Sequence, residues 1–184
     1  SEGADGLILV CAGAGGHAGT LSPFALVREV REFFDGPIAL SGSISEGSSV
    51  LSALALGADF AYVGTKFIAT EEANASPGYK QMIIDSTADD IMYSATFTGV
   101  NGNYLRPSVE AAGLNPEEHT SGSKDDMNFS TSAIAKKDNS SKAWKDIWGS
   151  GQGIGTIKDA PSVQTAVDQM VSEYEEAKSR LDNF

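Results

Sequence analysis

The chain has 184 residues, of which 41% are hydrophobic and 21% are charged, a balance typical of a globular protein with a core and unlike a disordered chain. It carries 13 Lys and Arg against 25 Asp and Glu, so its net charge of −12 repels nucleic-acid phosphates and anionic lipid headgroups. It has no apolar stretch near the roughly 20 residues that span a bilayer and no basic lead into a signal segment, so we expect a cytoplasmic protein without nucleic-acid or membrane partners.

Three short apolar segments, each followed by a helical pattern, occupy the first third of the chain. They span residues 6–11, 37–40 and 60–63. The first has no polar alternation, which is typical of a parallel strand covered on both faces. The alternation of strand and helix predicts a parallel sheet with right-handed crossovers.

The helices between these strands carry start and stop signals. Ser22 and Pro23 form an N-cap and first-turn pair, and the apolar residues that follow fall on one face of an amphipathic helix. Residues 49–56 form a second helix, and Gly57 supplies the left-handed residue that ends it.

The regular alternation of strands and helices does not continue through the second half of the chain. We expect a helix over 71–85 and β structure over 91–106 with turns at Gly99 and at 101–103. A polar surface connection over 117–142 is expected to be mobile. Pro161 opens a final helix that packs on the outside of the domain. Its expected apolar stripe is Val163, Val167, Met170, Val171, Tyr174 and Leu181.

A (β/α)8 barrel has eight strands, whereas this chain supplies three βα units and a mixed tail. Ser1 is not a start methionine, and the first strand follows almost at once. We therefore expect an α/β fold that is the C-terminal part of a TIM-type barrel, with the N-terminal half outside this sequence. The regions would be 1–85 as barrel units, 86–142 as a smaller substrate-side α+β region, and 143–184 as a glycine-rich loop and C-terminal helix that packs on the barrel.

His17 follows the first strand, directly after a glycine-rich run at 13–16. In parallel α/β folds, ligands bind at the carboxyl ends of the strands. Glycines permit close approach of a ligand, and an imidazole exchanges a proton near neutral pH. A loop histidine that only hydrogen-bonds a carbonyl is the alternative, but this position favours a catalytic or ligand-contacting role.

Small residues also follow the second and third strands, at 41–47 and at Gly64 and Thr65. They expose backbone N–H groups ahead of helices, and both features favour an anion. The pair of loops predicts a phosphate site without a dedicated lysine, although any one glycine could be only a turn residue. The segment 149–155 has no G-x-G-x-x-G register and no preceding strand, so we interpret it as a loop of close backbone approach, with Gln152 as a candidate polar contact to a ring.

Three further side chains are expected to be structural. Cys11 is the only cysteine, which excludes a disulfide within the chain and fits a reducing compartment. In its apolar strand it is expected to be an inert hydrophobe rather than a nucleophile. Trp144 and Trp148 lie four residues apart, and core packing is favoured over ring stacking. No metal site is predicted.

The chain resembles the nitronate monooxygenase family, formerly called 2-nitropropane dioxygenases. The matching segments occur in order at 3–5, 15–19, 41–44, 56–59, 63–67, 72–73, 102–106 and 151–153. The resemblance implies an FMN-dependent barrel enzyme that oxidises alkyl nitronates or nitroalkanes with dioxygen to a carbonyl compound and nitrite. The Gly-Gly-His and Gly-Thr elements are shared with flavin-dependent enoyl and quinone reductases.

The resemblance also implies roles for particular residues. His17 would lie on the substrate side of the flavin ring as a base or as an anion partner. Gly15 would lie against the flavin, and Ser43, Gly64 and Thr65 would hold its phosphate. The full set implied to bind FMN is Gly15, Gly16, Gly42, Ser43, Tyr62, Val63, Gly64, Thr65 and Gln152.

The sequence departs from the family at two positions. Many members carry glutamine where Val10 stands and glycine where Ser43 stands, so one polar flavin contact is lost and one hydroxyl is added. Three alternatives stay open: an FMN-dependent NAD(P)H enoyl or quinone reductase, a flavin-free phosphate-binding barrel lyase or isomerase, and a non-catalytic remnant that acts as a binding partner. A homo-oligomer is compatible with the sequence.

Overall fold

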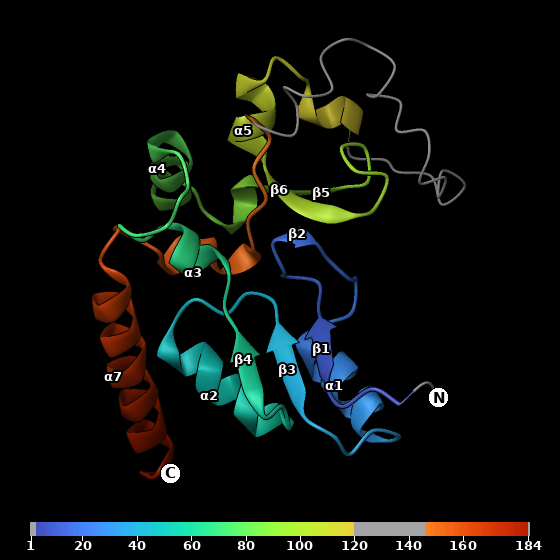
Figure 1. Cartoon of the computed structure of the whole chain (residues 1–184), viewed down its shortest axis with the longest axis vertical. Coiled ribbons are helices and arrows are strands. Elements are labelled where there is room, and N and C mark those ends of the chain that lie inside the picture. Colours follow the sequence, from blue (N-terminus) through green and yellow to red (C-terminus); the bar gives the residue numbers. More distant parts are fainter. Residues whose placement is uncertain (1–2, 120–145, 184) are drawn as a thin grey trace.

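The computed structural model describes residues 3–119 and 146–183. Its first sheet is parallel, with strand order β1-β3-β4, and is formed by Leu7–Val10, Ile38–Ser41 and Phe60–Tyr62 (Figure 1). In its register, Ile8 pairs with Ala39 and Ala39 with Phe60. The three predicted strands and the α/β class with parallel strands are confirmed.

Helix α1 (Pro23–Arg31) begins where the sequence predicts. The Ser22 side chain accepts a hydrogen bond from Ala25 N (3.4 Å), and Pro23 occupies the first turn, where its missing N–H costs nothing. Val27 and Val30 are buried on the helix face that meets the sheet. The amphipathic pattern of this segment therefore sets which face packs.

Helix α2 (Gly47–Leu56) ends at Gly57, whose φ of +108° is left-handed, as predicted. It packs with α1 against one face of the parallel sheet. Cys11 is buried in this core, as its apolar strand predicts. The buried cluster comprises Leu9, Cys11, Val27, Val30, Ile38, Leu40, Ile44, Ala53 and Ala58.

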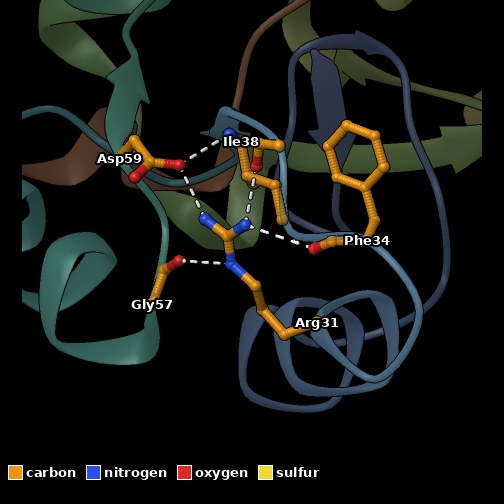
Figure 2. A network of polar contacts seen from close by, with 6 residues as sticks. Arg31, Phe34, Ile38, Gly57 and Asp59 are labelled. Carbon is orange, nitrogen blue, oxygen red and sulfur yellow. Dashed lines mark hydrogen bonds and ion pairs between the residues drawn. The ribbon is translucent and has the colours of Figure 1, made fainter. Parts of the chain in front are cut away.

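Arg31, at the end of α1, joins the amino-terminal end of the sheet to both helices (Figure 2). Its Nε donates to Gly57 O (2.8 Å), its Nη1 to Gly36 O (2.7 Å) and its Nη2 to the Asp59 carboxylate (2.6 Å). Asp59 also accepts from Ile38 N (2.8 Å). The Ile38 N–H and then the Arg31 guanidinium lower the pKa of Asp59 below its ordinary value, because both stabilise the charged carboxylate.

The other face of the parallel sheet is uncovered within the described residues. Strand side chains alternate between faces, and those opposite the helices are large and apolar. Ile8 is 59% exposed, Val10 40%, Phe60 62% and Tyr62 53%. β1 and β4 are also the end strands of this sheet. Parallel sheets are normally covered on both faces, so this surface is atypical.

A second, antiparallel sheet lies above the carboxyl ends of the first (Figure 1). Its order is β2-β6-β5, formed by Gly16–His17, Gly102–Leu105 and Ile91–Ser94. The predicted β structure and the turn at Gly99 (φ +77°) are confirmed. The predicted turn at 101–103 is wrong for Gly102 and Asn103, which lie in β6 because that strand pairs with both neighbours.

The helix predicted over 71–85 is shorter than expected. A four-residue helix, α3 (Thr65–Ile68), follows β4, and α4 (Pro77–Asp85) begins only after a turn region. Ser76 accepts from Tyr79 N (3.2 Å), so the Ser-Pro pair at 76–77 is the true start signal. Helix α5 (Arg106–Ala111) follows β6, and 3-10 turns span Ala88–Asp90, Pro116–His119 and Gln152–Thr156.

The C-terminal helix α7 (Val163–Leu181) packs along α2, with Ser162 as its N-cap, one residue after Pro161 (Figure 1). The predicted apolar stripe is wrong for its valines and leucine. Val163, Val167, Val171 and Leu181 are exposed, whereas Ala166 and Ala177 are buried. Small residues permit the close helix contact that larger ones would prevent.

Two sequence predictions fall outside the described residues. These are the polar connection from residue 120 to 142 and the position of Trp144. Among the helices that the structure describes, none combines the length and the apolar character needed to cross a membrane.

Candidate active site

Loops after the three parallel strands converge on one cavity of about 270 Å³. Seven of the nine residues predicted to bind the cofactor line it: Gly15, Gly16, Gly42, Ser43, Tyr62, Gly64 and Thr65. Val63 and Gln152 are not among the lining residues. Val63 packs against the helix-covered core, and the Gln152 backbone N donates to Gly13 O (3.0 Å). Their assignment to a flavin contact stays a prediction.

The loops of this cavity are hydrogen-bonded to one another. Gly13 O, after β1, accepts from Ser43 N, after β3 (3.1 Å). Gly151 N donates to Thr65 Oγ1, after β4 (3.0 Å), and Ser45 Oγ donates to Gly153 O (2.7 Å). The segment 149–153 therefore closes the cavity from the C-terminal part of the chain. Its sequence predicts a close backbone approach but not the loops that it approaches.

Several glycines are required by close backbone contacts. A Cβ at Gly15 would lie 2.6 Å from Gly151 N, and one at Gly153 would lie 2.8 Å from Ser43 O. Real Cβ atoms essentially never approach so closely, and the neighbours are backbone atoms that cannot rotate away. The predicted close backbone approach of the segment 149–155 is confirmed at Gly149, Gly151 and Gly153 and is wrong at Gly155, which has no heavy atom within 4 Å of its Cβ position.

Ser43 has a left-handed backbone, with a φ of +56°. Among the described residues it is the one non-glycine with positive φ. A left-handed conformation costs an ordinary residue roughly 1–2 kcal/mol, and such strain concentrates at functional sites. Glycine would adopt this backbone without that strain.

The cavity lining is small and uncharged. Of its described lining residues, eight are glycines and none is charged. An anion in this cavity would be held by backbone N–H groups and by the hydroxyls of serine and threonine. The N-terminus of the helix after the Gly64 loop would contribute little to anion binding, since α3 has only four residues.

Tyr79 forms part of the wall of this cavity, which the sequence analysis did not predict. Tyr79 lines the cavity and stacks on Trp148, with ring centroids 5.0 Å apart and planes 17° apart. The Tyr79 hydroxyl donates to Gly149 O. Burial raises the pKa of Tyr79 to about 12, so the phenol stays protonated at neutral pH. Trp148 stacks on Tyr79 and also packs against buried core residues, so core packing and ring stacking are compatible at this position.

His17 lines a second cavity of about 270 Å³ that adjoins the first. Gly16 and Gly149 line both cavities. His17 lies on β2, where it pairs with Gly102 of β6, and its Nε2 contacts Thr98 Oγ1 (3.2 Å). The remaining lining residues are Phe97, Thr98, Tyr104 and Ile147.

Asn103 fixes the loop that carries His17. Its buried side chain donates to Ala12 O (2.8 Å) and to Ala14 O (2.7 Å), and its backbone O accepts from Ser150 N (3.2 Å). One β6 residue thus holds both the loop after β1 and the segment 149–153. No local sequence signal predicts this contact, because its partners lie about ninety positions apart.

The described residues contain no group of three His, Cys, Asp or Glu side chains placed to hold a metal ion. The polar groups among the described residues that line the two cavities are the His17 imidazole, the hydroxyls of serine, threonine and tyrosine, and backbone amides.

Comparisons with known sequences agree on one family. The sequence profile described as Nitronate monooxygenase matches residues 1–173. A nitronate monooxygenase from Paraburkholderia phytofirmans is 30% identical over 125 residues, which cover 63% of this chain and 34% of that protein. A probable nitronate monooxygenase from Staphylococcus aureus is 27% identical over 130 residues, which cover 62% and 37%. The chain spans about a third of the length of these curated relatives.

Solved structures share the fold. Nitroalkane oxidase from Streptomyces ansochromogenes superposes with a TM-score of 0.73 at 26% identity, over 97% of this chain and 54% of that one. FabK from Thermotoga maritima superposes with a TM-score of 0.77 at 24% identity, over 98% and 58%. The FabK likeness concerns the fold alone.

Proposed function

Because the chain belongs to the nitronate monooxygenase family, we propose that the complete protein binds FMN in the glycine-lined cavity and oxidises alkyl nitronates and nitroalkanes with dioxygen, giving a carbonyl compound and nitrite. The observation that carries the proposal is the convergence of three strand-end loops and the segment 149–153 on one cavity, with His17 in the adjoining one.

In this proposal, β1, β3 and β4 are three strands of a (β/α)8 barrel. Their parallel order, with helices on one face, is that of barrel units. The apolar residues on the uncovered face, Ile8, Val10, Phe60 and Tyr62, would then point into the barrel. The solved structures of this fold are longer than the chain, which covers 54% of the nitroalkane oxidase.

The residues of the first cavity fit a flavin nucleotide. Its glycines leave backbone N–H groups accessible, and the hydroxyls of Ser43 and Thr65 add polar partners for a phosphate. Gly64 faces open space, with no heavy atom within 4 Å of the position of a Cβ. Ser43, Gly64 and Thr65 would hold the phosphate, and Gly15 and Gly16 would lie against the ring.

FMN, when bound, would supply the redox chemistry by taking an electron from the nitronate and passing it on to dioxygen. The chain's own contribution is proton transfer and anion binding. Neutral His17 would take a proton from the carbon next to the nitro group, and the imidazolium so formed would stabilise the nitronate oxygens. Phe97 and Ile147, in the same cavity, would contact the alkyl part of the substrate.

A matched pair of glycine variants tests the cofactor cavity. Gly64→Ala adds a methyl group to the cavity without touching the protein, whereas Gly155→Ala adds one at a position that also has open space but does not line the cavity. A charge-assisted hydrogen bond contributes about 1.5–3 kcal/mol, so loss of one phosphate contact raises the FMN dissociation constant roughly 10- to 100-fold. Fluorescence titration of the complete apoprotein measures both variants. Equal affinities in the two variants would contradict the placement.

The role of His17 has its own test. His17→Asn in the complete protein is expected to retain FMN, because His17 lines the second cavity and not the first. It should lose most turnover of neutral nitroalkanes, since asparagine cannot take the proton. Full nitroalkane turnover in this variant would remove His17 from the mechanism.

A further inference from the structure

Thr98 lies beside His17 in the second cavity. Its Oγ1 lies 3.2 Å from His17 Nε2, 3.2 Å from the Tyr104 hydroxyl and 2.9 Å from Val100 O. His17, Thr98 and Tyr104 all line that cavity. Thr98 belongs to the connection between β5 and β6, far from His17 in sequence, so their contact depends on the pairing of β2 with β6.

The Thr98 hydroxyl donates its one proton to Val100 O. A threonine hydroxyl carries a single proton, and a carbonyl oxygen can only accept. The closest contact of Thr98 Oγ1 is Val100 O, so the hydroxyl donates there. Its lone pairs are then left to accept, and a hydrogen bond with His17 requires that Nε2 carries the proton.

The Tyr104 hydroxyl also favours Thr98 as the donor to Val100 O and as the acceptor from its other neighbours. Its hydroxyl contacts Thr98 Oγ1, and its ring packs edge-on against Phe97, with centroids 5.0 Å apart. Burial raises the pKa of Tyr104, so the phenol remains protonated at neutral pH and can donate to Thr98. Val100 N also donates to Thr98 Oγ1 (3.3 Å). With donors on this side of the oxygen, the threonine hydroxyl stays turned toward Val100 O.

We propose that Thr98 is a positioning residue that holds the His17 ring with its proton on Nε2, which leaves Nδ1 as the atom that takes the substrate proton. No described residue is a hydrogen-bond partner of Nδ1. In neutral imidazole one nitrogen donates and the other accepts, and the partner of the first decides the role of the second. This inference rests on the proposed function, in which His17 is the base.

Substitution of Thr98 by valine and by serine separates positioning from packing. Thr98→Val keeps the shape of the side chain but removes the hydroxyl, so the ring loses its acceptor. We expect kcat for a neutral nitroalkane to fall roughly 10- to 100-fold, the range for a displaced catalytic group, with KM little changed. Thr98→Ser should restore most of kcat, because the hydroxyl returns. A valine variant with normal kcat, or a serine variant as slow as the valine variant, would overturn the proposal.

The tautomer itself can be observed without turnover. In the complete protein with 15N-labelled histidine, the signals of His17 are those lost in His17→Asn. Neutral His17 is expected to carry its proton on Nε2, and Thr98→Val to raise the share of the Nδ1-protonated form. A wild-type ring protonated on Nδ1, or equal tautomer shares in both proteins, would overturn the proposal. If the wild-type protein does not turn over nitroalkanes, the proposed function fails, while this measurement still tests the role of Thr98.

Discussion

Gly47, at the start of α2, lies in close contact with the backbone of α7. A Cβ at Gly47 would lie 2.8 Å from Glu173 C and still closer to Met170 O and Tyr174 N, all backbone atoms of α7. Ordinary contact begins at 3.4 Å, so Gly47→Ala forces the two helices apart. The same shift stretches the 2.8 Å hydrogen bond from Gly47 N to the Glu173 carboxylate.

The cost of Gly47→Ala follows from these two contacts. Overpacking of this kind costs about 1–3 kcal/mol, and a hydrogen bond to a charged group contributes about 1.5–3 kcal/mol. Because the carboxylate regains water when the helix moves, we expect the free energy of unfolding to fall by about 2–4 kcal/mol, a large part of the stability of a typical protein. Urea unfolding of the complete protein, followed by far-UV circular dichroism, measures this change.

Gly155→Ala is the control for the same substitution, since no heavy atom lies within 4 Å of its Cβ position and its φ is not positive. Its unfolding free energy should stay within about 0.5 kcal/mol of the wild-type value. If Gly47→Ala proved as stable as Gly155→Ala, the close packing of α7 on α2 would be refuted.

Three further predictions concern other positions. Ser43→Gly should raise the unfolding free energy by up to about 1 kcal/mol, because glycine adopts the left-handed backbone without strain; a decrease in urea unfolding would count against the strain. Since the folded pKa of Asp59 lies below its ordinary value of 3.8, its contribution to stability is present above that value and is lost as the pH falls through the folded pKa. Asp59→Asn should therefore destabilise the protein at neutral pH and reduce the loss of stability as the pH falls below 3.8. An unchanged loss of stability in acid would argue against the Arg31–Asp59–Ile38 contacts. Asn103→Leu leaves the buried Ala14 O and the partly buried Ala12 O without their donor, which should cost about 2–4 kcal/mol and weaken FMN binding. A stable variant with normal FMN affinity would exclude Asn103 as the support of that loop.

The parallel units were predictable because their signals are local. Ser22 and Pro23 mark the start of α1, Gly57 marks the end of α2, and the uninterrupted apolar run before Cys11 marks β1. Each of these sequence signals depends on residues within one turn or one strand. The strand-end position of the small-residue loops then follows from the fold class, which explains why seven predicted residues share one cavity.

The environment of His17 was not predictable in this way. Thr98 and Tyr104 reach it only because β2 pairs with β6, a contact between segments more than eighty residues apart. The aromatic residues at 97 and 104 suggested a β structure but not its partner. The predicted apolar stripe of α7 was wrong for a different reason. A hydrophobic pattern ranks valine above alanine, whereas the buried positions of α7 are the small residues Ala166 and Ala177.

We propose that this chain contributes to an FMN site with a base beside it, and the visible absorption spectrum of the complete protein tests this proposal. We expect a flavin spectrum on purification or after FMN addition, which changes on anaerobic addition of an alkyl nitronate and not on addition of NADH or NADPH. Bleaching by the nicotinamides alone would indicate the reductase alternative. A protein that is colourless and takes up no FMN would refute the proposed FMN site.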